Sequence, residues 1–347
     1  MQLIRKRKTY NPSQFVGRIT EFAYLRGWMA GQKQLLTITG PPGIGKTWFV
    51  NNSFQQLKAN GQIAYMVELP TVDSTSDQNE LSADLLQAWA GKLHIELNQD
   101  CPQAYGFDLG QEFSSQLERV AHDICHRCWP GQAIFFFIDG GDLLSQAAWR
   151  QFERQAIEPL ARQSAIRFII TLKTSQPIKS FMLKRREQRL ELGTLQGREQ
   201  GLQQMQKLNP ELDLAHCEFI LADYTWDHPG VNMLLAEHLA AADSGGGVVL
   251  PPDLVTTVLS ELEALPENGS ETINLLACLA HHDSDTWSAD TIAQLMNVSL
   301  AQAWNWINLL NHHWFITNVG GPNYKITDGL RQFLRAALGQ KLIEPKC

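Results

Sequence analysis

The stretch that decides the fold is Gly40-Pro41-Pro42-Gly43-Ile44-Gly45-Lys46-Thr47. It matches the phosphate-loop pattern G-x-x-x-x-G-K-[ST] completely. The apolar, β-branched run Gln34–Thr39 precedes it and a helical pattern follows it, which is the strand-loop-helix context that this pattern requires. Glycines let the backbone curl around phosphate oxygens, and the start of the helix adds a partial positive charge. The stretch therefore predicts a site for the phosphates of a nucleotide.

Each residue type in this loop has a chemical reason to be there. The ammonium group of Lys46 suits the β- and γ-phosphates, and the hydroxyl of Thr47 suits Mg²⁺, which prefers oxygen ligands. We therefore expect bound ATP or ADP together with Mg²⁺. The predicted nucleotide contacts within this stretch are Pro42, Gly43, Ile44, Gly45, Lys46, Thr47 and Trp48.

A second apolar run, Ile134–Asp139, ends in a carboxylate. A carboxylate at the end of a parallel strand suits Mg²⁺ from the side opposite Thr47, so Asp139 is a predicted metal ligand and catalytic residue. A cap for the following helix is the plainer alternative for Asp139. Gly140 stands where related AAA+ ATPases place a glutamate that activates water. Either Asp142 polarises water instead, or hydrolysis is slow.

Two further β-rich runs, 63–69 and 167–172, alternate with helical patterns. This alternation predicts an α/β fold with a parallel sheet. Together with the phosphate loop, it resembles a P-loop NTPase core of AAA+-like type. After Arg189 we expect no more strands but a small helical domain and, past the glycine-rich run 244–247, three helices and a hairpin typical of a winged helix. The predicted domains are an N-terminal segment 1–31, a nucleotide-binding domain 32–190, a helical domain 191–245 and a winged-helix domain 246–347.

The run Ile169–Thr174 ends in polar residues at the edge where ligands gather in open α/β sheets. Lys173 or Thr171 is therefore a candidate contact for the γ-phosphate, although a lysine at a strand end is often only solvated. The basic run Lys184–Arg186 is either an exposed helix or the source of an arginine that reaches a neighbouring subunit's phosphate.

The ordered motifs resemble the signal-transduction ATPases with numerous domains, the STAND family with its NB-ARC module, over almost the whole chain. Phe15-Val16-Gly17-Arg18-Ile19-Thr20-Glu21 is similar to the family's F-x-G-R-x-x-E element, followed here by Phe22. The backbone of that element lies beside adenine in relatives, which implies that Val16, Gly17 and Arg18 contact the nucleotide. Relatives often have arginine where Lys173 stands.

Two later segments extend the resemblance. His228-Pro229 is similar to the G-x-P element, whose helix approaches the nucleotide in relatives, and Ile326-Thr327-Asp328 stands in the place of M-H-D. The resemblance implies contacts from His228, Pro229 and Thr327. Because Thr327 replaces the histidine that touches the β-phosphate in relatives, only one hydroxyl is left for that role. A surface position for His228 and a helix cap for Asp328 are the alternatives.

Composition limits the partners and the location. The net charge of −7 over 347 residues gives no chain-wide field for nucleic acid or anionic lipid, and no apolar run is long enough to span a bilayer. Residues 246–347 hold ten acids and five bases, and the expected recognition helix 300–311 has no Lys or Arg, which disfavours DNA binding there. Six scattered cysteines predict reduced thiols and a cytoplasmic protein.

These observations lead to one expected function. The resemblance implies a switch that changes conformation when ATP replaces ADP, then self-assembles or engages partner proteins that supply sensor and effector functions, with weak ATPase activity as the reset. Two alternatives remain open: an AAA+ ATPase that loads onto DNA, of the origin-recognition or transposition type, and a structural scaffold locked around its nucleotide.

Overall fold

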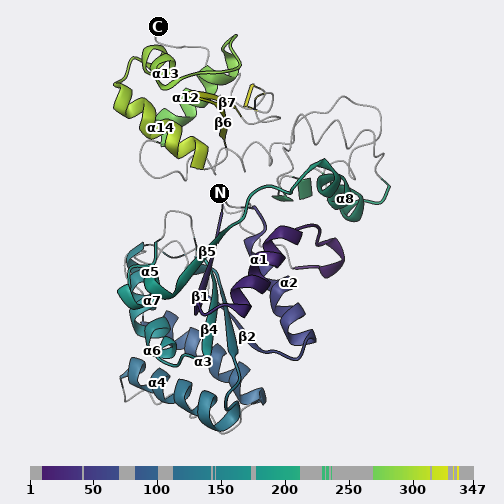
Figure 1. Cartoon of the computed structure of the whole chain (residues 1–347), viewed down its shortest axis with the longest axis vertical. Coiled ribbons are helices and arrows are strands. Elements are labelled where there is room, and N and C mark those ends of the chain that lie inside the picture. The colour runs from purple at the N-terminus through teal and green to yellow at the C-terminus, as the bar shows by residue number, and fades with distance from the viewer. Residues whose placement is uncertain are drawn as a thin grey trace. The chain divides into compact units, whose positions relative to one another are not determined.

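The computed structural model describes residues 10–40, 43–69, 83–100, 112–141, 144, 146–172, 177–211, 229–230, 232–233, 236, 269–312, 315–326, 331 and 334–335. The chain divides into two compact units, one made of Arg18–Gly40 and Gly45–Leu192, the other of Met1–Gly17, Pro41–Ile44 and Gly193–Cys347. We call the first the sheet unit and describe each unit by itself (Figure 1). Among the described residues, no helix combines the length and the apolar character needed to cross a bilayer.

The sheet unit contains five parallel strands in the order β2-β3-β4-β1-β5. Their bounds are β1 Leu35–Thr39, β2 Ile63–Glu68, β3 Ile134–Asp139, β4 Ile166–Thr171 and β5 Glu187–Glu191. Every residue of β1, β3 and β4 is buried, which explains why these three read as continuous apolar runs in the sequence. The expected α/β P-loop architecture is therefore confirmed. Since β4 lies between β1 and β3, the ends of all three strands meet at one edge.

Helices cover both faces of this sheet (Figure 1). Alternate side chains of β3 show this, because Phe135 and Phe137 contact Trp28 and Phe54 on one face, whereas Phe136 belongs to the large core on the other. The first face carries α1 Ile19–Ala30 and α2 Lys46–Ala59. The second carries α3 Ala83–Asp100, α4 Phe113–Asp123, α5 Gln146–Phe152 and α6 Glu158–Ala161, with π-helical turns η2 Ile124–Cys128 and η4 Glu153–Ile157.

A buried arginine at the start of β4 fixes α1 to the sheet. The guanidinium of Arg167 donates to the carbonyl oxygens of Trp28, Met29 and Lys33 and lies 4.2 Å from the centroid of the Trp28 ring. Arg167 is 9% exposed, and its burial lowers the pKa of its guanidinium. The carbonyls at the end of a helix carry partial negative charge, so one cation satisfies them there.

The sequence analysis missed one strand, β5, which continues two residues past Arg189. β5 pairs with β1 along its whole length, and only Leu190 within it is buried. The hydroxyl of Thr37 donates to Glu187 Oε1 over 2.7 Å, so a polar contact helps to hold this edge strand. After β4, residues 177–180 lead into α7 Phe181–Arg186, which ends directly before β5.

The second unit contains a 3-10 turn η1 Pro12–Gln14, then α8 Arg198–Leu208, and further along the chain α12 Gly269–His281, α13 Ala289–Met296 and α14 Leu300–His312. Strands β6 Ile316–Gly320 and β7 Asn323–Ile326 form an antiparallel hairpin. Three helices and a hairpin around one buried cluster are consistent with the expected winged helix. Residues 212–228 and most of 231–245, which belong to the expected helical domain 191–245, lie outside the described residues.

The expectation that all six cysteines are reduced was wrong. Cys128 is disulfide-bonded, while Cys125 is a free thiol whose burial raises its pKa to about 11. Spacing alone did not reveal the bond, because a disulfide depends on which segments fold together.

Candidate nucleotide site

The phosphate loop has the backbone geometry that its glycines allow. Gly43 and Gly45 have φ values of 73° and 94°, in the left-handed region that favours glycine, and Gly45 is the N-cap of α2. An ideal Cβ on Gly45 would meet no atom within 4 Å, so the backbone there faces open space. Lys46 is 7% exposed, and its Nζ donates to the carbonyl oxygen of Gly40 over 2.9 Å. The lysine thus spans the loop from its end back to its beginning.

The helix that follows the loop is fixed by aromatic packing. Phe49 of α2 is fully buried, and its ring lies 4.8 Å from that of Phe22 in α1. The Asn51 side chain donates to the carbonyl of Thr47, which stays half-buried near the start of α2. Trp48 is half-buried as well. Packing of this kind holds the N-terminal end of α2, and with it the N–H groups that bind anions, in a defined place.

The N-terminal element begins α1 with two left-handed residues. Gly17 and Arg18 have φ values of 69° and 65°, and Val16 before them is buried. Arg18 is only 4% exposed and pairs with Glu21 Oε1 at 2.9 Å, while burial lowers the pKa of its guanidinium. The Arg-x-x-Glu spacing therefore makes a buried ion pair, so the side chain of Arg18 has a structural partner in its own helix.

Asp139 is held by a threonine of the neighbouring strand. Thr171 Oγ1 donates to Asp139 Oδ1 over 2.8 Å and accepts from the backbone N–H of Gly140 over 2.9 Å. Asp139 is 1% exposed and Thr171 is fully buried. The one proton of a hydroxyl makes one donated bond, and here Asp139 receives it. In this structure the hydroxyl of Thr171 orients the carboxylate of Asp139, and its suggested contact with the γ-phosphate stays a prediction.

Two glycines after Asp139 are required by the same close packing. Gly140 has a φ of 95°, which strains any other residue. A Cβ on Gly141 would lie 2.5 Å from the carbonyl oxygen of Thr171 and 2.9 Å from Leu172 Cδ2. Position 140 therefore holds a glycine, and not a glutamate, because its backbone has a positive φ that strains other residues.

In the second unit, a segment from the C-terminal half contacts the tip of the loop. An ideal Cβ on Gly230 would lie 2.8 Å from the carbonyl oxygen of Gly43. Gln204 of α8 holds this segment, since its Nε2 donates to the carbonyl oxygen of Pro229 and its Oε1 accepts from Asn232 Nδ2. Gln204 and Asn232 are 7% and 0% exposed. Pro229 thus belongs to a buried amide network that the sequence did not reveal.

The same unit brings α8 onto the N-terminal element. The Gln200 side chain lies against Gly17, and Lys207 Nζ donates to the carbonyl oxygen of Phe15 over 3.0 Å. Gln200 is a flexible side chain that can move away, so the positive φ of Gly17 is what strains any other residue there. The glycine of the F-x-G-R pattern is therefore explained by its backbone conformation.

The described donor set fits a magnesium nucleotide. Thr39 Oγ1, at the end of β1 directly before the loop, is buried and has no hydrogen-bond partner among the described residues. An unpartnered buried hydroxyl, two left-handed glycines, a buried lysine and a buried carboxylate suit an anionic group with its cation. Lys46, Thr47 and Asp139 supply the cation, hydroxyl and carboxylate expected from the sequence. Asp142, Pro42, Lys173, His228 and Thr327 lie outside the described residues and remain predictions.

Comparison with known protein families gives a match, which covers the phosphate loop and most of the sheet. Residues 29–175 match the family model described as AAA domain. The matched range contains the phosphate loop and β1 to β4, but it is less than half of the chain. No curated protein sequence matches the chain.

Several solved structures match the chain at low identity, with TM-scores below 0.5. A point mutant of Thermotoga maritima RuvB is 15% identical, over 92% of this chain and 95% of that chain, with a TM-score of 0.40. Drosophila ORC bound to DNA is 14% identical over 95% and 96%, with a TM-score of 0.42, and AMPPCP-bound DnaA from Aquifex aeolicus is 12% identical over 87% and 92%, with a TM-score of 0.40. At such values no ligand or activity carries over from them.

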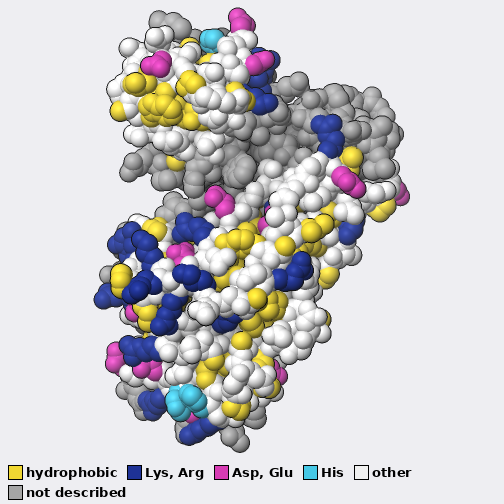
Figure 2. Space-filling view, viewed as in Figure 1, with side chains coloured by type: hydrophobic (Ala, Val, Ile, Leu, Met, Phe, Trp, Pro, Cys, Tyr) yellow, Lys and Arg dark blue, Asp and Glu magenta, His cyan; other side chains and the backbone are white. Residues whose placement is uncertain are grey.

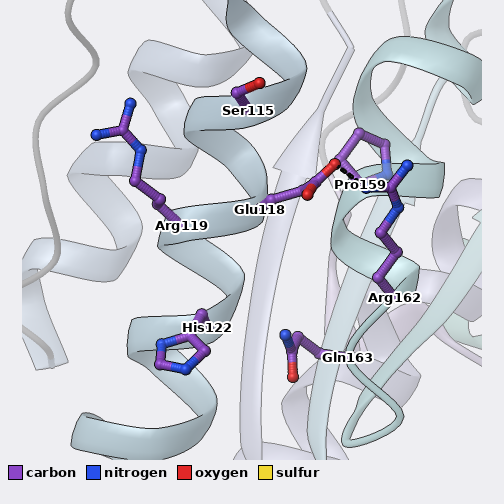
Figure 3. Close-up of a pocket in the computed structure, with 7 residues that line it drawn as sticks. All are labelled: Ser115, Glu118, Arg119, His122, Pro159, Arg162 and Gln163. Atoms are coloured by element: carbon purple, nitrogen blue, oxygen red, sulfur yellow. Dashed lines mark hydrogen bonds and ion pairs between the residues drawn. The ribbon is translucent and has the colours of Figure 1, made fainter.

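A surface pocket of about 460 Å³ lies elsewhere in the sheet unit (Figure 3). It is lined by Ser115, Glu118, Arg119, His122, Pro159, Arg162 and Gln163. Arg162 reaches across it to pair with Glu118, and both side chains remain largely exposed. None of its lining residues belongs to the phosphate loop or to a strand end, so this pocket is separate from the candidate nucleotide site.

Proposed function

We propose that this chain is an ATP- and ADP-binding molecular switch of the STAND class. The observation that supports it best is the close approach of Gly230 to Gly43. A phosphate loop tightens around its ligand through its backbone, and the backbone of Gly43 leaves no room for a side chain at Gly230 in the C-terminal half. A change in the loop therefore has a direct route to that segment, which is the physical requirement for a ligand to shift a conformational equilibrium.

The described residues have distinct roles in this proposal. Lys46 leaves the carbonyl of Gly40 to bind the terminal phosphates, and the N–H groups around Gly45 bind the remaining phosphate oxygens. Thr47 and Asp139 hold Mg²⁺, and Thr171 keeps the Asp139 carboxylate in a fixed orientation. The magnesium ion, when bound, neutralises charge on the phosphates. The family resemblance implies that the backbone of Val16 and Gly17 lies beside the adenine base of the nucleotide.

Weak hydrolysis is part of the proposal. No carboxylate can stand at position 140 without backbone strain, since Gly140 has a φ of 95°. The residue that activates water in related ATPases is therefore missing for a reason built into the fold. Slow turnover gives the ATP-bound state a long lifetime, which suits a switch. Partner proteins then supply the sensor and the effector, and the ATP-bound chain forms homo-oligomers.

A nucleotide-locked scaffold is a second candidate, because the same Gly140 and Thr171 contacts also favour a site without turnover. The two differ in one measurable respect. A switch releases phosphate slowly and changes its assembly with the nucleotide, whereas a scaffold keeps one nucleotide and one size.

The test is light-scattering mass measurement of the purified chain with Mg-ADP, Mg-ATP or a non-hydrolysable ATP analogue. We expect a larger particle with ATP and its analogue than with ADP. Lys46→Ala should abolish the difference by preventing binding. Gly230→Ala should keep nucleotide binding but weaken the coupling, because its methyl group collides with the Gly43 carbonyl. One mass under all conditions, with nucleotide bound, would favour the scaffold.

A further inference from the structure

A basic face of the sheet unit has no role in the nucleotide site. Residues 146–189 contain ten Lys and Arg against three Glu and no Asp, a net charge of +7 in a chain whose total is −7. Figure 2 shows dark blue side chains gathered on the side of this unit where Figure 1 labels α5 and α7. A strong local positive charge in an acidic protein calls for an explanation of its own.

Four of these ten cations have structural partners. Arg167 binds the end of α1, Arg162 pairs with Glu118, and Arg189 pairs with Glu187. Arg186 donates to Gln34 Oε1 and to the carbonyl of Ala161, which removes it as an arginine that reaches toward a neighbouring subunit.

Five other cations of this stretch are exposed, and the ion pairs of the described residues include none of them. They are Arg150, Arg154, Lys179, Lys184 and Arg185. Lys33 extends the group, since its Nζ donates to the carbonyl oxygen of Arg185. Two of the three glutamates of this stretch are engaged otherwise, because Glu153 accepts from backbone N–H groups and Glu187 binds Thr37 and Arg189.

An aromatic ring projects from the same face. Phe181, the first residue of α7, is 75% exposed, more than any other large hydrophobic residue among those described. The guanidinium of Arg185, one turn later, lies 5.5 Å from the centroid of its ring. Exposure of a phenylalanine to water is unfavourable, so a planar ring kept beside a guanidinium suggests a surface that is covered by a partner.

The end of α7 and the phosphate loop lie at opposite ends of β1. The backbone N–H of Gln34, before β1, donates to the carbonyl oxygen of Arg186, which places the end of α7 at the amino end of β1. The phosphate loop follows the carboxyl end of the same strand. Variants of the basic face can therefore be tested with nucleotide binding as an independent control.

We propose that this face, formed by Arg150, Arg154, Lys179, Lys184, Arg185 and Phe181, binds single-stranded nucleic acid. Lysine and arginine side chains contact the phosphates, and Phe181 stacks on an unpaired base, as aromatic residues do in sequence-tolerant binding of single strands. A duplex hides the faces of its bases, and α7 is too short, at about 9 Å, to act as a recognition helix in a groove. An acidic polypeptide satisfies the charges but offers few flat rings to stack on Phe181.

The experiment is fluorescence anisotropy of the full chain with a labelled oligothymidylate of about 20 nucleotides, a length that exceeds one such binding site. We expect binding at about 50 mM salt, with log affinity falling against log salt by about 3 to 4 for five phosphate contacts. The unlabelled strand should displace the probe, whereas duplex DNA and poly-glutamate at equal charge should do so far less well.

Substitutions at one ring separate stacking from general hydrophobic contact. Phe181→Leu should weaken binding about 5- to 100-fold, the range for loss of one base-aromatic contact, while Phe181→Trp should retain it. Lys184→Glu with Arg185→Glu should weaken binding at least about tenfold and reduce the salt slope. Lys58→Glu, a single charge reversal at an exposed position of α2, is the matched control for Arg185→Glu alone and should change little.

Three results would overturn the proposal: no binding at low salt, equal affinity of Phe181→Leu and the unaltered chain, or an equal effect of Lys58→Glu and Arg185→Glu. Equal or better binding of poly-glutamate would assign the face to an acidic protein instead and would also contradict it. In every case calorimetry with Mg-ADP should give an unchanged affinity, which shows that the variants fold.

Discussion

Thr171 Oγ1 lies 2.8 Å from Asp139 Oδ1 and donates a hydrogen bond to it, while the N–H of Gly140 donates to the same hydroxyl. This relationship joins the ends of β4 and β3 in the buried edge of the sheet. It fixes the orientation of the carboxylate, and it explains the glycines that follow Asp139. The orientation of Asp139, the predicted metal ligand, therefore depends on a threonine of the neighbouring strand.

Replacing Thr171 with valine, which has nearly the same shape, should uncouple these contacts. The buried N–H of Gly140 then has no acceptor, so we expect a loss of about 1–3 kcal/mol in unfolding free energy. Mg-dependent nucleotide affinity should fall about tenfold, while affinity measured with EDTA should change little. Urea unfolding and calorimetry check both values. Thr171→Ser keeps the hydroxyl and should restore most of the affinity, whereas equal defects in both variants would argue against the assigned role.

A glutamate introduced at position 140 should not speed up ATP hydrolysis. Gly140→Glu places a side chain on a residue with φ of 95°, so we expect a loss of about 1–3 kcal/mol in stability and no gain in the rate of phosphate release. Gly27→Ala in α1 is a suitable control, because a Cβ there meets nothing within 4 Å and helical glycines are replaced favourably by alanine. Faster hydrolysis by Gly140→Glu in a phosphate-release assay would contradict our reason for slow turnover.

Much of this fold followed from the sequence, for identifiable reasons. Strands buried on both faces, such as β3, appear as apolar runs, and the spacing of Gly40, Gly45 and Lys46 fixes a loop that few other sequences form. β5 was not predicted, because an edge strand with one buried residue does not appear as an apolar run in the sequence. The hydrogen bond from Thr171 to Asp139 was not predicted either, since it depends on β4 lying next to β3. Contacts such as Gly230 with Gly43 join residues far apart in the chain and leave no local pattern.

Arg167 should be among the most sensitive positions outside the nucleotide site. Arg167→Met keeps most of the side chain's volume but leaves the carbonyls of Trp28, Met29 and Lys33 without their shared donor. We expect a loss of about 2–4 kcal/mol in unfolding free energy, measured with urea. Arg167→Lys should recover only part of it, because one ammonium group cannot reproduce the planar set of donors. A loss below about 0.5 kcal/mol for Arg167→Met would show that the contacts contribute little.

Glu153 should make stability depend on pH. Burial raises the pKa of this carboxyl group above its ordinary value of 4.5, against the opposing effect of N–H donors from Ser180 and Lys179, and Glu158 and Glu187 add to the rise. A raised pKa in the folded state means that Glu153 keeps its proton to a higher pH in the folded chain than in the unfolded chain. Stability from this group is therefore greatest below pH 4.5 and falls as the pH rises toward the folded pKa.

Glu153→Gln removes this titration and keeps an oxygen for the N–H groups of Lys179 and Ser180. We expect the variant to gain stability relative to the unaltered chain as the pH rises from 4.5 toward 7. Urea unfolding of both chains across this range measures the difference. A difference that stays constant with pH would show that the carboxyl group titrates alike in the folded and unfolded states.

The central claim is that a magnesium nucleotide binds at the phosphate loop, and calorimetric titration of the full chain with Mg-ADP and Mg-ATP tests it most directly. We expect one nucleotide per chain, a large loss of affinity for Lys46→Ala, and normal affinity for Lys58→Ala, which removes the same charge from an exposed position of the same helix. Absence of saturable binding, or identical binding by Lys46→Ala, would contradict the account.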